Sequence, residues 1–468
     1  MGFSFFYNIY DDQSTIDFVK SGIERKTIRL NILIKQELKT MKTDRLLFYR
    51  ESKDINILKD MDTLTLLAFE DKDKVRGTKL YFDIISGLYR FAGENGFEGN
   101  LWHCYLTELL VYNENEYTKV CEKRGEVKGS LSEAVLGDLR IFMEFFDLDF
   151  SLLTNYIGDD SINAVKTYES SGKGAIKYNK RITAEINKLA DNLGNAKTVE
   201  EFKALLDEFY GHFGVGVYGL HKAFRVEEKD EELVVKPIFN IAVTSLDDLV
   251  GYESQKKQLV DNTEAFLKGR KANNCLLFGD AGTGKSSSIR AILNTYYDDG
   301  LRMIEVYKHQ YRELNALIDN LKTRNYKFII YMDDLSFEEF ETDYKYLKAV
   351  IEGGLESKPD NVLIYATSNR RHLVKETTLD RDGEDMHKSE TVQEKLSLFA
   401  RFGVSIYFGA PEKREFDEIV LTLAHRYNIP LDDKEILVGA NKWELNHSGR
   451  SGRVARQYIN DLRHRFDL

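Results

Sequence analysis

Two different hydrophobic patterns divide the chain. Over its first half, apolar residues recur at the spacing of amphipathic helices, for example between Ile16 and Met41 and between Glu200 and Phe213. No proline occurs before Pro237, which agrees with a helical segment because proline is excluded from helix interiors. The pattern therefore predicts a mostly helical N-terminal domain over residues 1–237.

The spacing of the apolar residues changes at the end of this domain. Phe224–Val226 and Leu233–Val235 are short apolar segments, and the charged residues Glu227–Glu232 separate them. Such a pair of segments predicts a short β-hairpin with a solvated tip. We expect this hairpin to close the N-terminal domain, with the domain boundary near residue 238.

From residue 238 to residue 410, short apolar runs alternate with helical patterns. The runs are almost continuously apolar, which is typical of strands buried on both faces of a parallel sheet. We therefore expect an α/β core with a five-stranded parallel sheet, followed by a helical lid over residues 411–468. The predicted strands are Cys275–Phe278, Met303–Tyr307, Phe328–Met332, Val362–Ala366 and Val404–Phe408.

A glycine-rich segment follows the first of these strands and leads into a helix. It fits the pattern G-x-x-x-x-G-K-[ST], in which glycines let backbone N–H groups turn towards phosphate oxygens. The helix N-terminus adds partial positive charge. Lys285 is expected to reach the β- and γ-phosphates of a nucleotide, and the Ser286 hydroxyl is expected to hold Mg²⁺. The predicted nucleotide contacts are Gly279, Asp280, Ala281, Gly282, Thr283, Gly284, Lys285, Ser286 and Ser287.

Polar residues at the ends of the later strands complete this site. Asp333 ends the third strand, where ligands bind in open α/β sheets, and a carboxylate there can hold Mg²⁺. Asp334 is placed to orient or deprotonate the attacking water, and Asn369 can hydrogen-bond the water and the γ-phosphate. Arg401 is a candidate for reaching the γ-phosphate of a neighbouring subunit, and Arg453 for reaching it from the lid.

Taken together, these motifs resemble the AAA+ ATPase superfamily over about residues 245–466, and more specifically the bacterial family of predicted AAA+ ATPases filed as domain of unknown function 815. The segments that carry the second resemblance span residues 262–266, 333–338, 355–361 and 366–373. The resemblance implies adenine contacts from Val250 and Gly251, and it implies ATP sites at the subunit interfaces of a homo-oligomer. It identifies Asp333 and Asp334 as Walker B, Asn369 as sensor 1, Arg401 as the arginine finger and Arg453 as sensor 2.

The sequence departs from the AAA+ pattern in two places. Asp334 stands where most members have Glu, which favours slow hydrolysis, with Glu338 as a substitute base. The stretch Tyr307–Arg312 lacks the glycine of a protein-threading pore loop, which argues against an ordinary unfoldase. Elsewhere, Gly214–Gly219 spells G-x-G-x-x-G but follows a helix, so a turn is the simpler interpretation. The charged linker His372–Gln393 is interpreted as a solvated loop, with an ordered insert as the alternative.

Composition and charge exclude several classes of protein. The net charge of −11 argues against general nucleic-acid binding. No apolar run approaches the roughly 18 residues of a membrane-spanning helix, and the opening residues do not fit a secretory signal. Three cysteines without a C-x-x-C pair, and nine histidines without a ligand-like pair, favour a reduced, cytoplasmic protein with no structural zinc.

We therefore expect an Mg²⁺-dependent ATPase that binds ATP and works as a ring or a nucleotide-dependent assembly. Its N-terminal domain would engage an unknown protein partner, which the ATPase would remodel or assemble. One alternative is a switch or loader that binds ATP, assembles and scarcely hydrolyses it. Another is an ATPase related to nucleic-acid-associated initiators.

Overall fold

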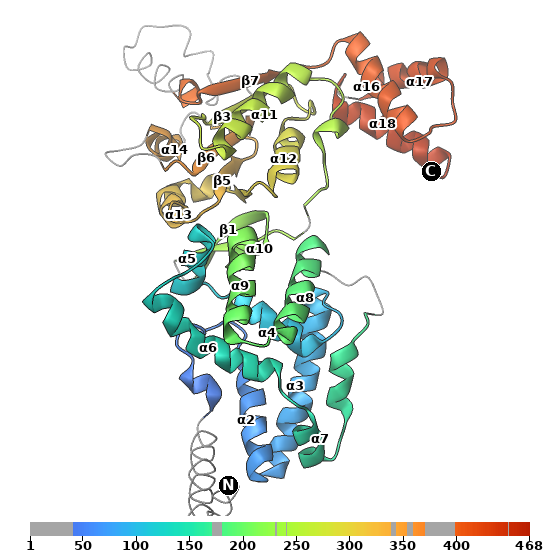
Figure 1. The fold of residues 1–468 in the computed structure, drawn as a ribbon. Coiled ribbons are helices and arrows are strands. Elements are labelled where there is room, and N and C mark those ends of the chain that lie inside the picture. Colours follow the sequence, from blue (N-terminus) through green and yellow to red (C-terminus); the bar gives the residue numbers. More distant parts are fainter. Residues whose placement is uncertain are drawn as a thin grey trace, which may run out of the picture. The chain divides into compact units, whose positions relative to one another are not determined.

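The computed structural model describes residues 41–170, 180–229, 232–239, 241–337, 343–352, 359–369, 398–447 and 449–468. The chain divides into two compact units between Gly216 and Val217 (Figure 1). Three expectations lie outside the described residues and stay predictions. They concern the helix from Ile16 onwards, Glu338 as a substitute base and the linker over residues 372–393.

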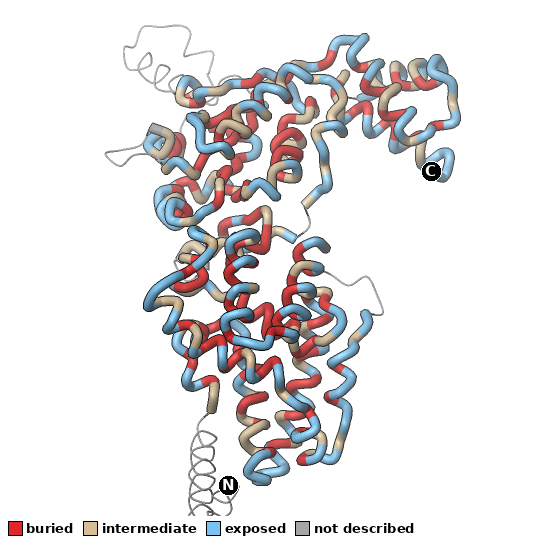
Figure 2. Tube along the Cα trace, viewed as in Figure 1, coloured by how far each residue is buried: buried red, intermediate tan, exposed pale blue. Residues whose placement is uncertain are grey.

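Helices make up the N-terminal unit, as the sequence predicts. Its centre is α4 (Leu101–Tyr112), whose side chains are almost all buried because the helix is apolar on every side. The helices α3, α6 and α8 pack against it, and Figure 2 shows their buried faces turned inward. Among its described residues, the α-helices of this unit include α2 (Asn56–Glu70), α3 (Lys74–Asn95), α4, α5 (Glu116–Arg124), α6 (Ser130–Phe146), α7 (Ser151–Ile157), α8 (Lys180–Asn195) and α9 (Val199–Phe213).

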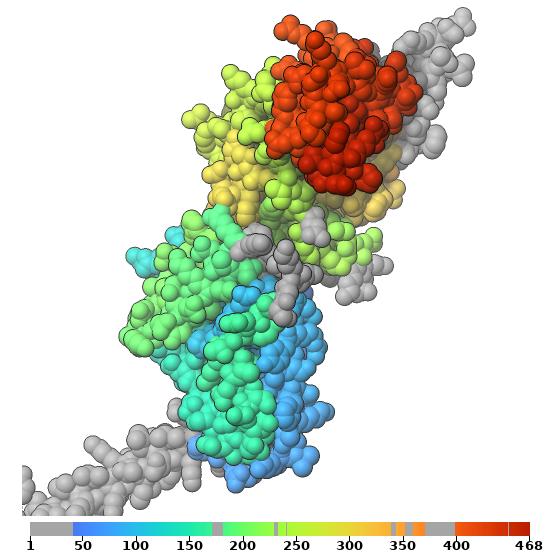
Figure 3. All heavy atoms as spheres, turned by 90° about the vertical axis from the view of Figure 1, so that its right-hand side faces the viewer, coloured from blue at the N-terminus to red at the C-terminus, as the bar shows by residue number. Residues whose placement is uncertain are grey.

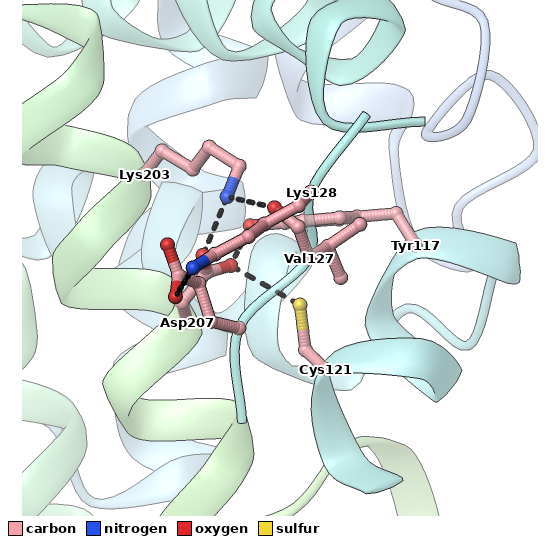
Figure 4. Close-up of polar contacts among 7 residues, drawn as sticks. Tyr117, Cys121, Val127, Lys128, Lys203 and Asp207 are labelled. Carbon is pink, nitrogen blue, oxygen red and sulfur yellow. Dashed lines mark hydrogen bonds and ion pairs between the residues drawn. The ribbon is translucent and has the colours of Figure 1, made fainter. Parts of the chain in front are cut away.

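A buried polar cluster joins α5 to α9 in this unit (Figure 4). Lys203 and Asp207 form an ion pair of 2.5 Å one turn apart on α9, and both are more than nine-tenths buried. Asp207 Oδ1 also accepts hydrogen bonds from Tyr117 Oη at 2.6 Å and Cys121 Sγ at 3.1 Å, both on α5. Lys203 Nζ donates a further bond to the backbone oxygen of Val127. The charges are thus satisfied, and the cluster fixes how α5 and α9 pack.

Removing the charge of one partner in the Lys203–Asp207 ion pair should strongly destabilise the N-terminal unit. Lys203→Met leaves the Asp207 carboxylate buried without its counter-charge, which costs about 3–5 kcal/mol. Chemical denaturation of the full chain, followed by circular dichroism, measures the loss. The exposed pair between Lys72 and Glu70 provides the control, because Lys72→Met should cost less than about 1 kcal/mol. Equal effects of the two substitutions would contradict this interpretation of the cluster.

The second unit is built on a parallel sheet with strand order β2-β1-β4-β5-β6-β3-β7. All five predicted strands are present, and the pairs among them are parallel, as expected. Four of them are buried along almost their whole length, which agrees with their apolar sequences. The fifth, the edge strand β7, is partly exposed. The strands are β1 (Ala223–Lys229), β2 (Glu232–Pro237), β3 (Cys275–Gly279), β4 (Leu301–Glu305), β5 (Lys327–Met332), β6 (Val362–Ser368) and β7 (Val404–Phe408).

The prediction of a five-stranded sheet was wrong, because the hairpin adds two strands. β1 and β2 form the expected antiparallel hairpin, but β1 also pairs in parallel with β4, so the sheet has seven strands. Phe224 and Val226 of β1 are buried in the core of the sheet. The division of the chain therefore falls before the hairpin, at residue 216, and not near residue 238. Pairing with β1 also covers the edge of β4, whose backbone groups would otherwise lack partners.

Helices cover both faces of the sheet, and the lid forms a separate helical part of the same unit. The helices α11 (Glu253–Leu267) and α12 (Lys285–Tyr296) pack on one face, and α13 (Leu314–Leu321) and α14 (Asp343–Glu352) pack on the other. As predicted, the chain after residue 411 is helical and has its own apolar core. Figure 3 shows these C-terminal residues, in orange and red, gathered into one body. The lid helices are α16 (Lys413–Arg426), α17 (Asp433–Asn446) and α18 (Gly452–Arg465).

Candidate active site

The loop between β3 and α12 has the backbone that its glycines predict. Gly279, Gly282 and Gly284 all adopt positive φ angles, of 129°, 77° and 98°. Side chains rarely tolerate this conformation. At Gly279 an added Cβ would also lie 2.2 Å from the backbone oxygen of Phe408, so only glycine fits beside β7. The loop can therefore turn its backbone N–H groups inward at the N-terminus of α12, where a phosphate group would be stabilised.

The side chain of Lys285, the first residue of α12, reaches back into this loop. Its Nζ donates hydrogen bonds to the backbone oxygens of Gly279 and Asp280, at 3.0 and 2.6 Å. Burial lowers the pKa of Lys285, and the nearby carboxylates of Asp280 and Asp334 act in the opposite direction. The side chain is therefore a buried hydrogen-bond donor held inside the loop.

Asp333 is the point where three elements meet. Its Oδ1 accepts hydrogen bonds from Ser286 Oγ of α12 at 2.7 Å and from Thr367 Oγ1 of β6 at 2.5 Å. Partial burial acts to raise the pKa of Asp333, but the hydrogen bonds from Thr367 and Ser286 outweigh it and hold this pKa below its ordinary value. The carboxylate is therefore ionised at neutral pH.

Asp334 and Asn369 are brought together beside Asp333. The Asn369 side-chain amide donates a hydrogen bond of 2.9 Å to Asp334 Oδ1, and the Asp334 backbone N–H donates one of 3.0 Å to Thr367 Oγ1. Asp334 has a φ of 50°, in the left-handed region. Asp and Asn enter this region more readily than Glu does. The local backbone thus accounts for an aspartate where the AAA+ pattern expects a glutamate.

These groups surround a cavity of about 510 Å³ between the sheet and the lid. Of the predicted contacts, Val250 and the loop from Ala281 to Ser287 line it, and Gly251, Gly279 and Asp280 do not. Arg453 of α18 lines it too, and its backbone N–H donates a hydrogen bond to the Gly282 oxygen. The predicted site residues that line the cavity are Val250, Ala281, Gly282, Thr283, Gly284, Lys285, Ser286, Ser287, Asp333, Asp334, Asn369 and Arg453.

Arg401 occupies a different place. It lies in the turn before β7 and does not line the cavity. A residue that acts on a neighbouring subunit need not line the cavity of its own chain. The proposed role of Arg401 at a subunit boundary therefore stays a prediction.

The sequence analysis missed several residues of the cavity wall. Arg290 follows Ser286 by one turn on α12, and Arg456 follows Arg453 by one turn on α18, so helical spacing could have revealed both. Thr367 lies two residues before the predicted Asn369, but its bond to Asp333 depends on the pairing of β5 with β6. The apolar wall formed by Ile419 and Leu423 depends on where the lid packs. The other lining residues are Asp248, Leu249, Tyr252, Gly452, Gln457 and Asn460.

The donor atoms suit a magnesium ion that is held partly by a nucleotide. Mg²⁺ prefers oxygen ligands, and at phosphate sites it uses one or two protein oxygens beside phosphates and water. Ser286 Oγ and Asp333 Oδ1 provide such oxygens at the edge of the phosphate loop. Over the described ranges, no group of three or more His, Cys, Asp or Glu residues could hold a metal without a nucleotide.

Among the residues that the structure describes, no helix combines the length and the apolar character that a membrane crossing would require.

Comparison with known proteins places the second unit in one family. The model of the family described as "Protein of unknown function (DUF815)" matches residues 219–466. The replication factor C large subunit of Staphylothermus marinus is 38% identical over 66 residues, which is 14% of this chain and 15% of that protein. The match thus spans a small part of this curated relative.

Solved structures of RuvB from Thermotoga maritima also match. The RuvB Holliday junction branch migration motor is 17% identical, with 48% of this chain and 67% of that chain covered and a TM-score of 0.32. A RuvB variant is 16% identical and gives the same TM-score, and the match covers 66% of that variant, just under two thirds of its length. Sequence identities and TM-scores this low support no conclusion about the function of this chain.

Proposed function

The chain belongs to the family described as "Protein of unknown function (DUF815)", and from this premise we propose that it is an Mg²⁺-dependent ATPase of the AAA+ type. The proposal joins the phosphate-loop sequence to the geometry around it. ATP would bind in the cavity between the sheet and the lid. Its phosphates would lie against the loop from Ala281 to Ser287, and its adenine would lie near Val250 and the adjoining Gly251.

One observation carries this proposal. Residues far apart in the sequence, from α12, the end of β5 and the end of β6, are linked by hydrogen bonds at one end of the cavity. The linked groups are a hydroxyl, two carboxylates and an amide, and the buried ammonium of Lys285 lies beside them. This is the set of groups that phosphoryl transfer to water requires, namely phosphate positioning, a metal ligand and a group that orients water.

Each side chain has a proposed task. Lys285 would leave the backbone oxygens of its own loop and donate to the β- and γ-phosphates. Ser286 and Asp333 would hold Mg²⁺, which would neutralise charge on the phosphate oxygens when bound. Asp334 would accept a hydrogen bond from the attacking water, and Asn369 would hold the Asp334 carboxylate in place. Arg453 would bring the lid towards the γ-phosphate.

Removal of the loop ammonium tests the binding step. Lys285→Ala should weaken ATP binding by at least about 100-fold, because charge-assisted bonds to phosphate are lost in a water-poor site. Calorimetry with Mg²⁺ and ATP measures this directly. Lys268→Ala is the control, since Lys268 forms an exposed ion pair with Glu264 away from the cavity. Unchanged ATP affinity in Lys285→Ala would refute the proposed site.

Removal of the Asp334 charge tests the hydrolysis step. Asp334→Asn should retain the fold and ATP binding, because Asn also tolerates a positive φ, but it should lower phosphate release by about 100-fold or more. Alanine is less suitable here, since it would strain the backbone. Steady-state phosphate release and the melting temperature are measured together. Wild-type turnover in the Asn variant would show that another group orients the water.

The oligomer and the partner are further parts of the proposal. Homo-oligomeric assembly would let Arg401 act on the ATP of a neighbouring subunit, and the N-terminal unit would bind a protein partner. The three cysteines are free and buried, which supports the proposed cytoplasmic location. An affinity purification with the ATP-loaded Asp334→Asn variant would identify the partner.

Mixing two inactive variants tests whether Arg401 acts between subunits. Arg401→Ala should bind ATP without hydrolysing it, and Lys285→Ala should not bind ATP. In a mixture, an intact Arg401 from one variant can face an intact phosphate loop from the other. Phosphate release should therefore reappear, at up to about a quarter of the wild-type rate for random mixing of neighbours in a ring. A mixture as inactive as its components would contradict action between subunits.

A slow switch or loader is the second candidate, and Asp334 favours it. The Asp334 carboxylate is one methylene shorter than the usual glutamate, and Asn369 already occupies its Oδ1. Such a protein would assemble on ATP and release phosphate slowly. Size-exclusion chromatography with ATP, compared with the rate of phosphate release, separates this candidate from a rapidly cycling motor.

A further inference from the structure

Tyr331 is a buried residue of β5 that the motifs of the site do not include. Its side chain is 3% exposed, and its hydroxyl has no hydrogen-bond partner of standard geometry among the residues that the structure describes. Buried hydroxyl groups in proteins nearly always have partners. A buried tyrosine without one therefore needs an explanation that packing alone does not provide.

The position of Tyr331 relates it to the proposed metal site. Tyr331 is the second-to-last residue of β5, two residues before Asp333, which follows the end of the strand. Its side chain packs in the apolar cluster on one face of the sheet. That face is covered by α12, which carries Ser286. Burial raises the pKa of the Tyr331 hydroxyl, the nearby Asp333 carboxylate raises this pKa further, and Ser286 acts in the opposite direction.

We propose that Tyr331 is a positioning residue for the magnesium site, an inference that rests on the proposed binding of Mg²⁺ and nucleotide. Its O–H donates a hydrogen bond to the Asp333–Ser286 pair when these two groups serve as metal ligands. Outer hydrogen bonds of this kind orient metal ligands and strengthen metal binding. Asp333 Oδ1 already accepts bonds from Ser286 and Thr367. Tyr331 is buried in the apolar cluster that also includes residues of α12.

The neighbouring strand supplies a matched control. Tyr365 of β6 pairs in register with Tyr331 and belongs to the same apolar cluster. Its hydroxyl is equally buried but contacts Thr263 Oγ1 at 2.9 Å and Asn262 Nδ2 at 3.0 Å, both on α11. Tyr365→Phe therefore removes a buried phenolic hydroxyl from the same core without touching the Asp333–Ser286 pair.

The experiment titrates Mg²⁺ into the full chain with a fluorescent ATP analogue. In Tyr331→Phe, the Mg²⁺ concentration at half-saturation should rise roughly three- to tenfold, the effect of one lost hydrogen bond beside a metal ligand. Binding of the analogue in EDTA should be unchanged. In Tyr365→Phe, the melting temperature should fall and the Mg²⁺ dependence should match the wild type.

The outcomes separate this inference from the proposed function. If wild-type protein binds the analogue no better with Mg²⁺ than in EDTA, the proposed function fails. If Mg²⁺ promotes binding to the wild type and Tyr331→Phe has the same Mg²⁺ dependence, the inference alone is overturned. Equal shifts in both tyrosine variants would also overturn it, since they would indicate a general effect on the core. Should Tyr331→Phe fold poorly, Tyr331→Met, which also lacks the hydroxyl, is judged by the same criteria.

Discussion

The site depends on one shared oxygen, Oδ1 of Asp333. Ser286 and Thr367 both donate hydrogen bonds to it, so the phosphate loop, the end of β5 and the end of β6 are fixed to one another there. These bonds offset the cost of partial burial and hold the pKa of Asp333 below its ordinary value. An ionised, oriented carboxylate beside the N-terminus of α12 is what a phosphate-bound cation requires.

The second feature of the site is the conformation of Asp334. Its φ is positive, its backbone N–H donates a hydrogen bond to Thr367, and its side chain accepts one from Asn369. Substitution of the usual glutamate by aspartate is therefore consistent with the local backbone, since aspartate tolerates this conformation better. In the proposed reaction, this bond to Asn369 would be shared or broken when water enters, so Asp334 would control the rate of hydrolysis.

Local sequence predicted those parts of the molecule that local physics determines. The phosphate loop is a contiguous motif whose glycines are required by the backbone at Gly279 and Gly284, and continuous apolar runs revealed the strands of the core. The sequence could not predict that β1 pairs with β4, because an antiparallel hairpin gives the same pattern alone or at the edge of a sheet. Thr367 and Tyr331 escaped notice for a related reason, since their neighbours at the site come from other elements.

The central claim is that this cavity binds ATP through a magnesium ion held by Ser286 and Asp333. The most direct measurement uses Mn²⁺ in place of Mg²⁺ and records its electron paramagnetic resonance with a non-hydrolysable ATP analogue and the full chain. The account predicts coupling of the protein-bound Mn²⁺ to phosphorus nuclei in the wild type and its loss in Asp333→Asn. A spectrum that shows Mn²⁺ bound no differently with the wild-type chain than with the analogue alone would contradict it.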